Sequence, residues 1–140
     1  MQPHPEDKVI EGRGRVALPG LVDCHTHSVW AGSRADEFRR RLAGESYSSI
    51  LEGGGGILST VEATRKATDQ ELVDATVARF KRFLRRGVTT VEVKSGYGLT
   101  PTHERRMLLA AKEAGRLVGI RKKMRTHGCS NGRMDPGYEF

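Results

Sequence analysis

The chain has 140 residues, which corresponds to about one domain, and it carries a net charge of +7. It contains no apolar run long enough to span a bilayer, and residues 1–15 lack the apolar region of a signal peptide. Its two cysteines, Cys24 and Cys129, match no CxxC spacing, which argues against a disulfide framework and favours a soluble, cytoplasmic protein.

The first expected element is a short buried strand in LPGLVDCHTH, residues 18–27, preceded by a short strand or turn over residues 9–17. Residues two apart in a strand point to the same face, so His25 and His27 should project side by side while Thr26 turns away. Two neutral imidazoles on one face can bind a transition metal such as Zn or Fe. The alternative is a pair of partly exposed histidines at a strand end. Cys24 should point away from them as a small packed residue.

A helix is expected over residues 33–43, with Ser33 as its N-cap and Gly44 at its end. A short helical turn and four consecutive glycines, Gly53 to Gly56, follow it. This glycine run lacks the Lys-Ser/Thr of a phosphate-binding loop, so it fits a flexible turn or a pocket-lining loop better than a nucleotide site.

The clearest helix begins at Thr68, which forms a capping box with Glu71, and ends before Gly87. Helical spacing predicts its buried face: Leu72, Ala75, Thr76, Phe80, Phe83 and Leu84. The β-branched segment VTTVEVKSGYG, residues 88–98, reads as a strand, and another helix opens at Thr100 and Pro101. Alternating strands and helices predict an α/β fold with parallel strands. Active sites gather at the carboxyl ends of such strands, which is where His25, His27 and the KSGYG segment lie.

Much of the positive charge lies in runs at residues 39–41, 81–86, 104–106 and 121–125. The first three fall on expected helices that also carry acidic and apolar residues, so they fit solvated helix faces. We therefore expect no nucleic-acid and no membrane partner. Steeply salt-dependent affinity would indicate the competing class, a basic nucleic-acid-binding protein.

PGLVDCHTH resembles the first barrel strand of the amidohydrolase superfamily, metal-dependent hydrolases built on a TIM (β/α)8 barrel. Together with HTHSVWAGSRADEFRRRLAGESYSSI, GGGILSTVEATRKAT and GVTTVEVKSGYGL, it resembles the imidazolonepropionase family over about residues 9–115. That family hydrolyses the cyclic amide C–N bond of 4-imidazolone-5-propanoate to N-formimino-L-glutamate in histidine degradation. The resemblance implies residues 1–17 as a remnant of an N-terminal β-sandwich and linker, and residues 18–115 as the first βα units of a partial barrel.

The resemblance also implies roles for individual residues. His25 and His27 match two ligands of a single Zn or Fe ion, and Arg34 and Tyr97 match residues that contact the substrate. A guanidinium suits the propanoate carboxylate, and a phenol can pack on the flat ring and form a hydrogen bond. From the residues alone, Arg34 could equally pair with Asp36 or Glu37 on its own helix, and Tyr97 could pack on its own loop. Lys94 is interpreted as a structural or pocket-rim residue.

The chain departs from the family in its length, because a TIM barrel typically needs about 250 residues. The remaining metal ligands and the acid–base residues are expected beyond this chain, so its catalytic residues are unknown and the chain alone should be inactive. Residues 116–140 no longer resemble the family and are expected to be a disordered tail, which a shifted reading frame or alternative splice would explain. His127 lies near the position of a substrate-site histidine but does not reproduce its motif.

Two hypotheses remain: an enzyme-family segment acting on a small-molecule substrate, homo-oligomeric at full length, and a noncatalytic regulatory partner that docks on full-length subunits through an unfinished sheet edge.

Overall fold

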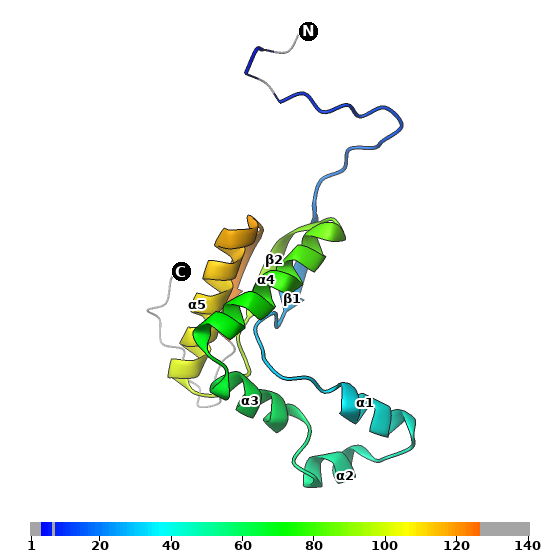
Figure 1. Cartoon of the computed structure of the whole chain (residues 1–140), viewed down its shortest axis with the longest axis vertical. Helices are drawn as coiled ribbons and strands as arrows, with labels where there is room; N and C mark the ends of the chain where they lie inside the picture. Colours follow the sequence, from blue (N-terminus) through cyan, green and yellow to red (C-terminus); the bar gives the residue numbers. More distant parts are fainter. Residues whose placement is uncertain (1–3, 7, 127–140) are drawn as a thin grey trace.

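The computed structural model describes residues 4–6 and 8–126. This part of the chain contains three strands and five helices (Figure 1), with these bounds in chain order: β1 Leu21–Thr26, α1 Ala35–Leu42, α2 Tyr47–Glu52, α3 Ile57–Lys66, α4 Asp69–Arg85, β2 Val88–Lys94, α5 Pro101–Val118 and β3 Arg121–Arg125.

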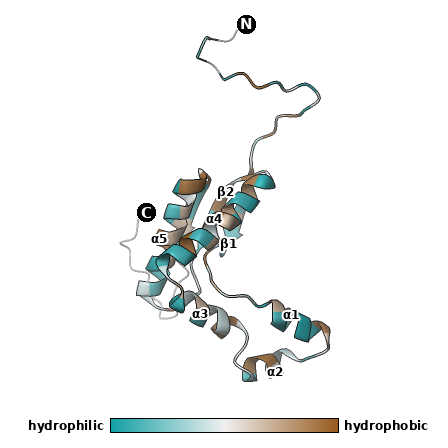
Figure 2. Cartoon of the chain, in the orientation of Figure 1, coloured by the Kyte–Doolittle hydropathy of each residue, from teal (hydrophilic) through white to brown (hydrophobic). Residues whose placement is uncertain are grey.

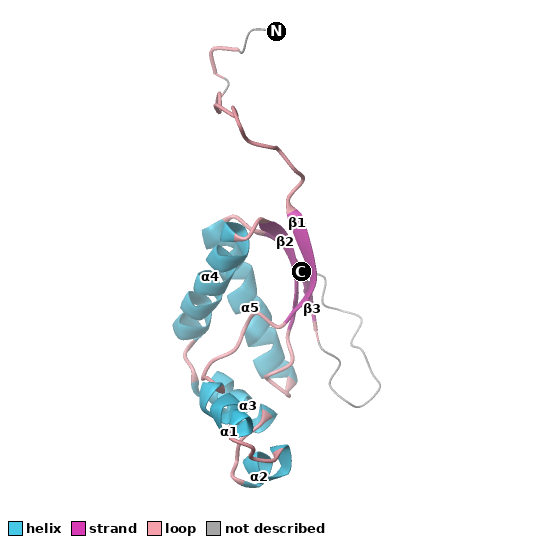
Figure 3. Ribbon diagram, turned by 90° about the vertical axis from the view of Figure 1, so that its right-hand side faces the viewer, coloured by secondary structure: helices cyan, strands magenta, loops and turns pink. Residues whose placement is uncertain are grey.

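The three strands form one parallel sheet in the order β1-β2-β3. Helix α4 precedes β2 and helix α5 connects β2 to β3, and both pack on the same face of the sheet (Figure 3). The expected α/β class with parallel strands is therefore confirmed. The carboxyl ends of β1 and β2 lie at one edge, where the chain leaves towards α1 and towards the segment before α5.

Local sequence signals set the boundaries of α4 and α5 as expected. The expectation that Ser33 caps α1 is wrong, because the N-cap is Arg34, which makes no side-chain cap hydrogen bond. The Thr68 hydroxyl accepts a hydrogen bond from the backbone N–H of Glu71, and the Glu71 carboxylate accepts one from the backbone N–H of Thr68, so the capping box of α4 is present. Gly87 follows the end of α4 at φ +81°, a conformation that favours glycine. Thr100 caps α5 and Pro101 occupies its first turn.

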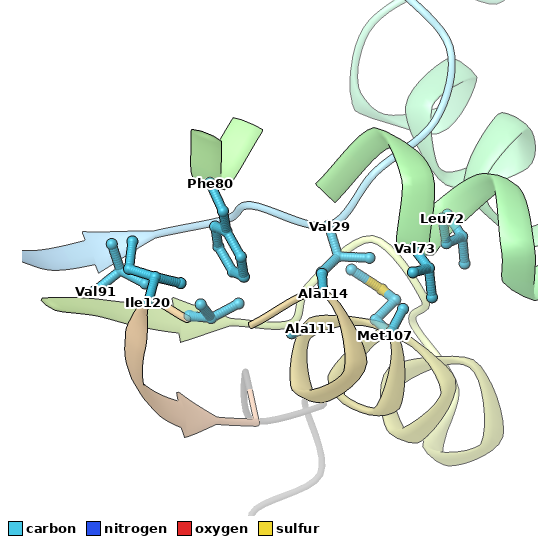
Figure 4. Close-up of a cluster of buried hydrophobic side chains, with 11 residues drawn as sticks. Val29, Leu72, Val73, Phe80, Val91, Met107, Ala111, Ala114 and Ile120 are labelled. Carbon is cyan, nitrogen blue, oxygen red and sulfur yellow. The ribbon is translucent and has the colours of Figure 1, made fainter. Parts of the chain in front are cut away.

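The core lies between the sheet and the two long helices (Figure 4). Phe80 of α4 is fully buried against it, together with Val91 and Val93 of β2. Helix α5 contributes small side chains, Ala111 and Ala114, which let its backbone approach the sheet closely. Of the face predicted for α4, Leu72, Thr76 and Phe80 are buried, while Phe83 and Leu84 pack at the margin of the core.

The structure decides one alternative and corrects two expectations about secondary structure. Of the strand or turn expected over residues 9–17, the turn is present, with the Arg15 N–H bonded to the Gly12 carbonyl, whereas residues 8–20 form no strand and run away from the sheet. Residues 57–66 form α3, which was not expected after the glycine run. Residues 116–125 are not a disordered tail, because they complete α5 and form β3. His127 and Cys129 lie outside the described residues.

Several apolar side chains lie outside the core and are exposed to solvent. Val16 and Leu18 in the extended N-terminal segment are 82% and 78% exposed, and α1 buries no residue at all, leaving Leu42 73% exposed. Figure 2 shows hydrophobic stretches, in brown, along the N-terminal segment. Within the described residues, the helices are all too short or too polar to cross a membrane.

Candidate functional site

Thr26 anchors the carboxyl end of β1. Its buried hydroxyl donates to the backbone carbonyl of Glu92 at 2.7 Å and lies 2.6 Å from the Ser28 hydroxyl. Because its one hydrogen goes to Glu92, Ser28 donates to Thr26. The pairing of β1 with β2 is irregular here, since Asp23 faces Val91 and Thr26 faces Val93. Thr26 therefore turns inward, as expected, on a strand end that bulges around His25.

His25 and His27 lie together at this strand end, and we call them the histidine pair. Their ring centroids are 5.4 Å apart in an edge-to-face arrangement. The ring of Tyr97, from the segment after β2, lies 5.7 Å from that of His27. The structure thus brings three of the four residues singled out from the sequence to the same edge of the sheet, His25 being exposed and His27 half-buried.

The spacing of the histidine pair fits two ligands of one metal ion. With metal–nitrogen distances of about 2.0–2.1 Å and tetrahedral geometry, two imidazoles on one ion hold their ring centres roughly 5 Å apart. Residues 4–6 and 8–126 contain no group of three or more His, Cys, Asp or Glu side chains that could hold such an ion. The pair therefore fits part of a metal site, and the described residues do not complete it.

Arg34 does not lie with the histidine pair. Its Nε donates to Glu37 at 2.8 Å, and this bond is the main cause of the lowered pKa of Glu37. The other oxygen of Glu37 accepts from the backbone N–H of Gly56 at 2.9 Å. Helices α1 and α2 lie beyond the end of the sheet (Figures 1 and 3). The structure therefore shows the local ion pair, which was the alternative interpretation of Arg34.

Two neighbours of the site also have defined surroundings. Lys94 is half-buried and lies 3.7 Å from Glu92, which also pairs with Arg125 at 3.1 Å. This ion-pair network fits the structural role, one of the two interpretations given for Lys94. Cys24 is exposed, so the expectation that it packs inside is wrong.

Sequence reasoning missed Arg79, which bonds to the backbone of Ser28, the residue after the histidine pair. Its guanidinium stacks over the ring of Trp30 at 3.7 Å and donates to the Ser28 carbonyl at 3.0 Å. Burial, with a smaller contribution from Arg82, lowers the pKa of Arg79 to about 10, so it remains charged at neutral pH. In the sequence Arg79 looks like one more basic residue on a solvated helix face, and only the position of a tryptophan just after the histidine pair could have suggested a partner.

The chain is similar to proteins named imidazolonepropionase, and no family model matches it. It is 52% identical to the one from Ectopseudomonas mendocina over 118 residues, 50% identical to that of Idiomarina loihiensis over 119, and 54% identical to that of Legionella pneumophila strain Paris over 110. These matches cover 84%, 85% and 79% of this chain, but only 29%, 29% and 27% of the relatives. The resemblance carried by the sequence motifs is thereby confirmed, and the chain spans less than a third of the length of these relatives.

Proposed function

We propose that this chain is the segment of an imidazolonepropionase that supplies two of the metal's ligands and part of the substrate pocket. The full enzyme would hydrolyse the cyclic amide C–N bond of 4-imidazolone-5-propanoate, a small molecule, in the cytoplasm and without a nucleic-acid or membrane partner. The observation that carries the proposal is the cluster of His25, His27 and Tyr97 at the carboxyl edge of parallel strands, in a chain about half identical to enzymes of that name.

The proposed fold of the full enzyme is a TIM barrel of the amidohydrolase type. Strands β1, β2 and β3 are parallel, and their helices lie on one face, as in the wall of such a barrel. The opposite face, which carries Glu92 and Lys94, would then line the interior. Barrel enzymes place their catalytic groups at the carboxyl ends of the strands, the edge at which the histidine pair lies.

The histidine pair would hold one Zn or Fe ion together with ligands from outside the described residues. When bound, such an ion lowers the pKa of water and polarises the scissile carbonyl. The chain's own contribution is to fix the direction of the two imidazoles. The Thr26 hydroxyl and the Arg79 guanidinium do this by holding the backbone on either side of His27.

Tyr97 and Arg34 are the proposed substrate contacts. The Tyr97 ring already faces His27, so a flat heterocycle bound beside the histidine pair would pack against it. Arg34 would bind the propanoate carboxylate through its guanidinium. This role has two requirements. The substrate carboxylate must displace Glu37 from Arg34, and the α1–α2 segment must move so that Arg34 reaches the pocket.

A chimera tests the proposal. Residues 18–115 of this chain would replace the matching segment of the Ectopseudomonas mendocina protein, and hydrolysis of the imidazolone would be measured by loss of its ultraviolet absorbance. We expect an active chimera that loses turnover in His25→Ala and His27→Ala. A folded chimera that binds metal but does not turn over would contradict the proposal.

Matched variants separate binding roles from general effects. Tyr97→Ala and Arg34→Ala should raise KM, whereas Tyr47→Ala and Arg39→Ala should leave KM unchanged, because both control side chains are exposed on the outer helices α2 and α1. If Arg34→Ala and Arg39→Ala changed KM equally, Arg34 would not be a substrate contact.

A noncatalytic role of the chain by itself is the second candidate. Within the described residues β1 is an edge strand, and its Leu21 and Val22 are 59% and 65% exposed. An open, apolar strand edge can pair with another chain. Copurification of this chain with a coexpressed full-length imidazolonepropionase, abolished by Val22→Lys, is the expected result for docking. Failure to copurify would reject it.

A further inference from the structure

The segment between β2 and α5, which carries Tyr97, is fixed from two sides. Glu104, in the first turn of α5, accepts hydrogen bonds from the backbone N–H groups of Gly98 at 2.8 Å and Leu99 at 2.6 Å, both through Oε1. On the opposite side, Arg65 of α3 donates to the Gly98 carbonyl at 2.7 Å. Both peptide groups that follow Tyr97 are therefore held by charged side chains.

Glu104 is buried to an unusual degree for a carboxylate, with only 3% of its surface exposed. Its second oxygen, Oε2, is also buried and has no hydrogen-bond partner among the described residues. Burying a carboxylate costs free energy unless its oxygens accept hydrogen bonds that replace those to water. The bonds accepted by Oε1 fix the conformation of the Gly98–Leu99 backbone.

Stabilisation of helix α5 does not explain this arrangement. Thr100 already caps the helix by accepting from the backbone N–H of His103, whereas Glu104 bonds to groups that precede the helix. The loop is also tightly constrained. A Cβ at Gly98 would lie 2.6 Å from the Glu104 nitrogen, and Leu99 adopts a positive φ of 56°, which is uncommon for a leucine. The surroundings thus impose one backbone conformation next to Tyr97.

We propose that Glu104 is a positioning residue for Tyr97. It acts through the N–H groups of Gly98 and Leu99, with Arg65 as its counterpart at the Gly98 carbonyl, and together they hold the phenol ring against His27. The effect of Glu104 on substrate binding rests on the proposed function, in which Tyr97 contacts the substrate. The geometric claim can be measured on the 140-residue chain without metal or substrate.

The test is NMR of the full chain with Glu104→Met, which removes both acceptor oxygens and keeps a side chain of similar length. We expect loss of the NOE between the Tyr97 and His27 rings and about tenfold faster hydrogen exchange at Leu99. The amide of Phe80 in the core should keep its protection. Glu104→Gln retains one acceptor oxygen and should keep the NOE, as should Glu113→Met, which alters a half-exposed glutamate on the same helix.

An intact NOE in folded Glu104→Met would overturn the proposal. If that variant loses protection throughout the core, Arg65→Met decides instead: a lost NOE supports the positioning role, and a retained NOE rejects it.

The chimera separates this inference from the proposed function. Failure of the chimera to hydrolyse the imidazolone would leave the NMR result standing. If it is active, Glu104→Met should raise KM but have no further effect in a Tyr97→Ala background, since both changes remove the same contact. Additive effects would show that Glu104 does not act through Tyr97.

Discussion

The substitution Thr26→Val tests how the strand end holds the histidine pair. Valine has nearly the same shape as threonine, so no cavity forms, but the hydroxyl that joins Glu92 and Ser28 is lost. Ser28 is 4% exposed, so its hydroxyl loses a partner in a buried environment, and the Glu92 carbonyl loses one at a half-buried position. An unsatisfied buried group costs about 1–3 kcal/mol, which predicts a loss of roughly 2–3 kcal/mol in the free energy of unfolding.

Urea unfolding followed by circular dichroism measures this loss as a lower midpoint at an unchanged m-value. Thr26→Ser keeps the hydroxyl and should lose only about 1 kcal/mol, the contribution of one buried methyl group. Thr102→Val alters an exposed threonine on α5 and should change stability by less than about 0.5 kcal/mol. If Thr26→Val were as stable as the wild type, the hydroxyl would not be the anchor of β1, and the orientation of the histidine pair would need another cause.

Three further predictions concern the core, the α4 cap and the metal. Phe80→Ala should cost about 3–5 kcal/mol in urea unfolding because Phe80 is fully buried, whereas Phe38→Ala, at an exposed position, should cost less than about 0.5 kcal/mol. The backbone N–H of Thr68, and secondarily its hydroxyl, hold the pKa of Glu71 below its ordinary value of 4.5. The contribution of Glu71 to stability is therefore complete above pH 4.5 and is lost as the pH falls through the lowered pKa. Acid titration of the unfolding midpoint should show a smaller loss in Glu71→Gln than in the wild type, because other carboxylates with a lowered pKa, such as Glu37, still contribute in the variant. Because the histidine pair supplies two imidazoles and the described residues contain no complete ligand group, EDTA should leave the melting temperature of the chain unchanged, and the zinc-loaded chain should not hydrolyse the imidazolone. Turnover by the isolated chain, or a melting temperature that falls with EDTA, would contradict this reading of the site.

The elements that the sequence predicted are those whose boundaries depend on local chemistry. The capping box at Thr68, the glycine at position 87 and the Thr100–Pro101 start act through neighbouring residues, so their patterns are sufficient. Helix α3 was missed because the preceding glycines suggest a loop. Yet Gly56, at φ +77°, forms its N-cap, and Ser59 and Glu37 bond to this end of the helix.

Strand β3 was missed for a different reason, because RKKMR contains only one apolar residue. In the structure it alternates: Arg121, Lys123 and Arg125 are exposed, while Lys122 and Met124 are half-buried towards α5. The long aliphatic stem of a lysine can cover apolar surface while its charge stays in water. Pairing with β2 then supplies the hydrogen bonds, and this tertiary contact cannot be read from the composition of the segment.

The same distinction explains which parts of the candidate site were predictable. The positions of His25, His27 and Tyr97 follow from strand ends in a parallel sheet, a rule that needs only the order of elements. Arg34 depends on where α1 lies, and α1 has no buried residue to fix it against the sheet, so the sequence could not choose between Glu37 and the pocket. Arg79 and Glu104 bond to backbone groups of residues 51 and 5–6 positions away, and such contacts leave no periodic pattern. Side chains that point at the site could thus be predicted from the sequence, whereas those that fix its backbone required the structure.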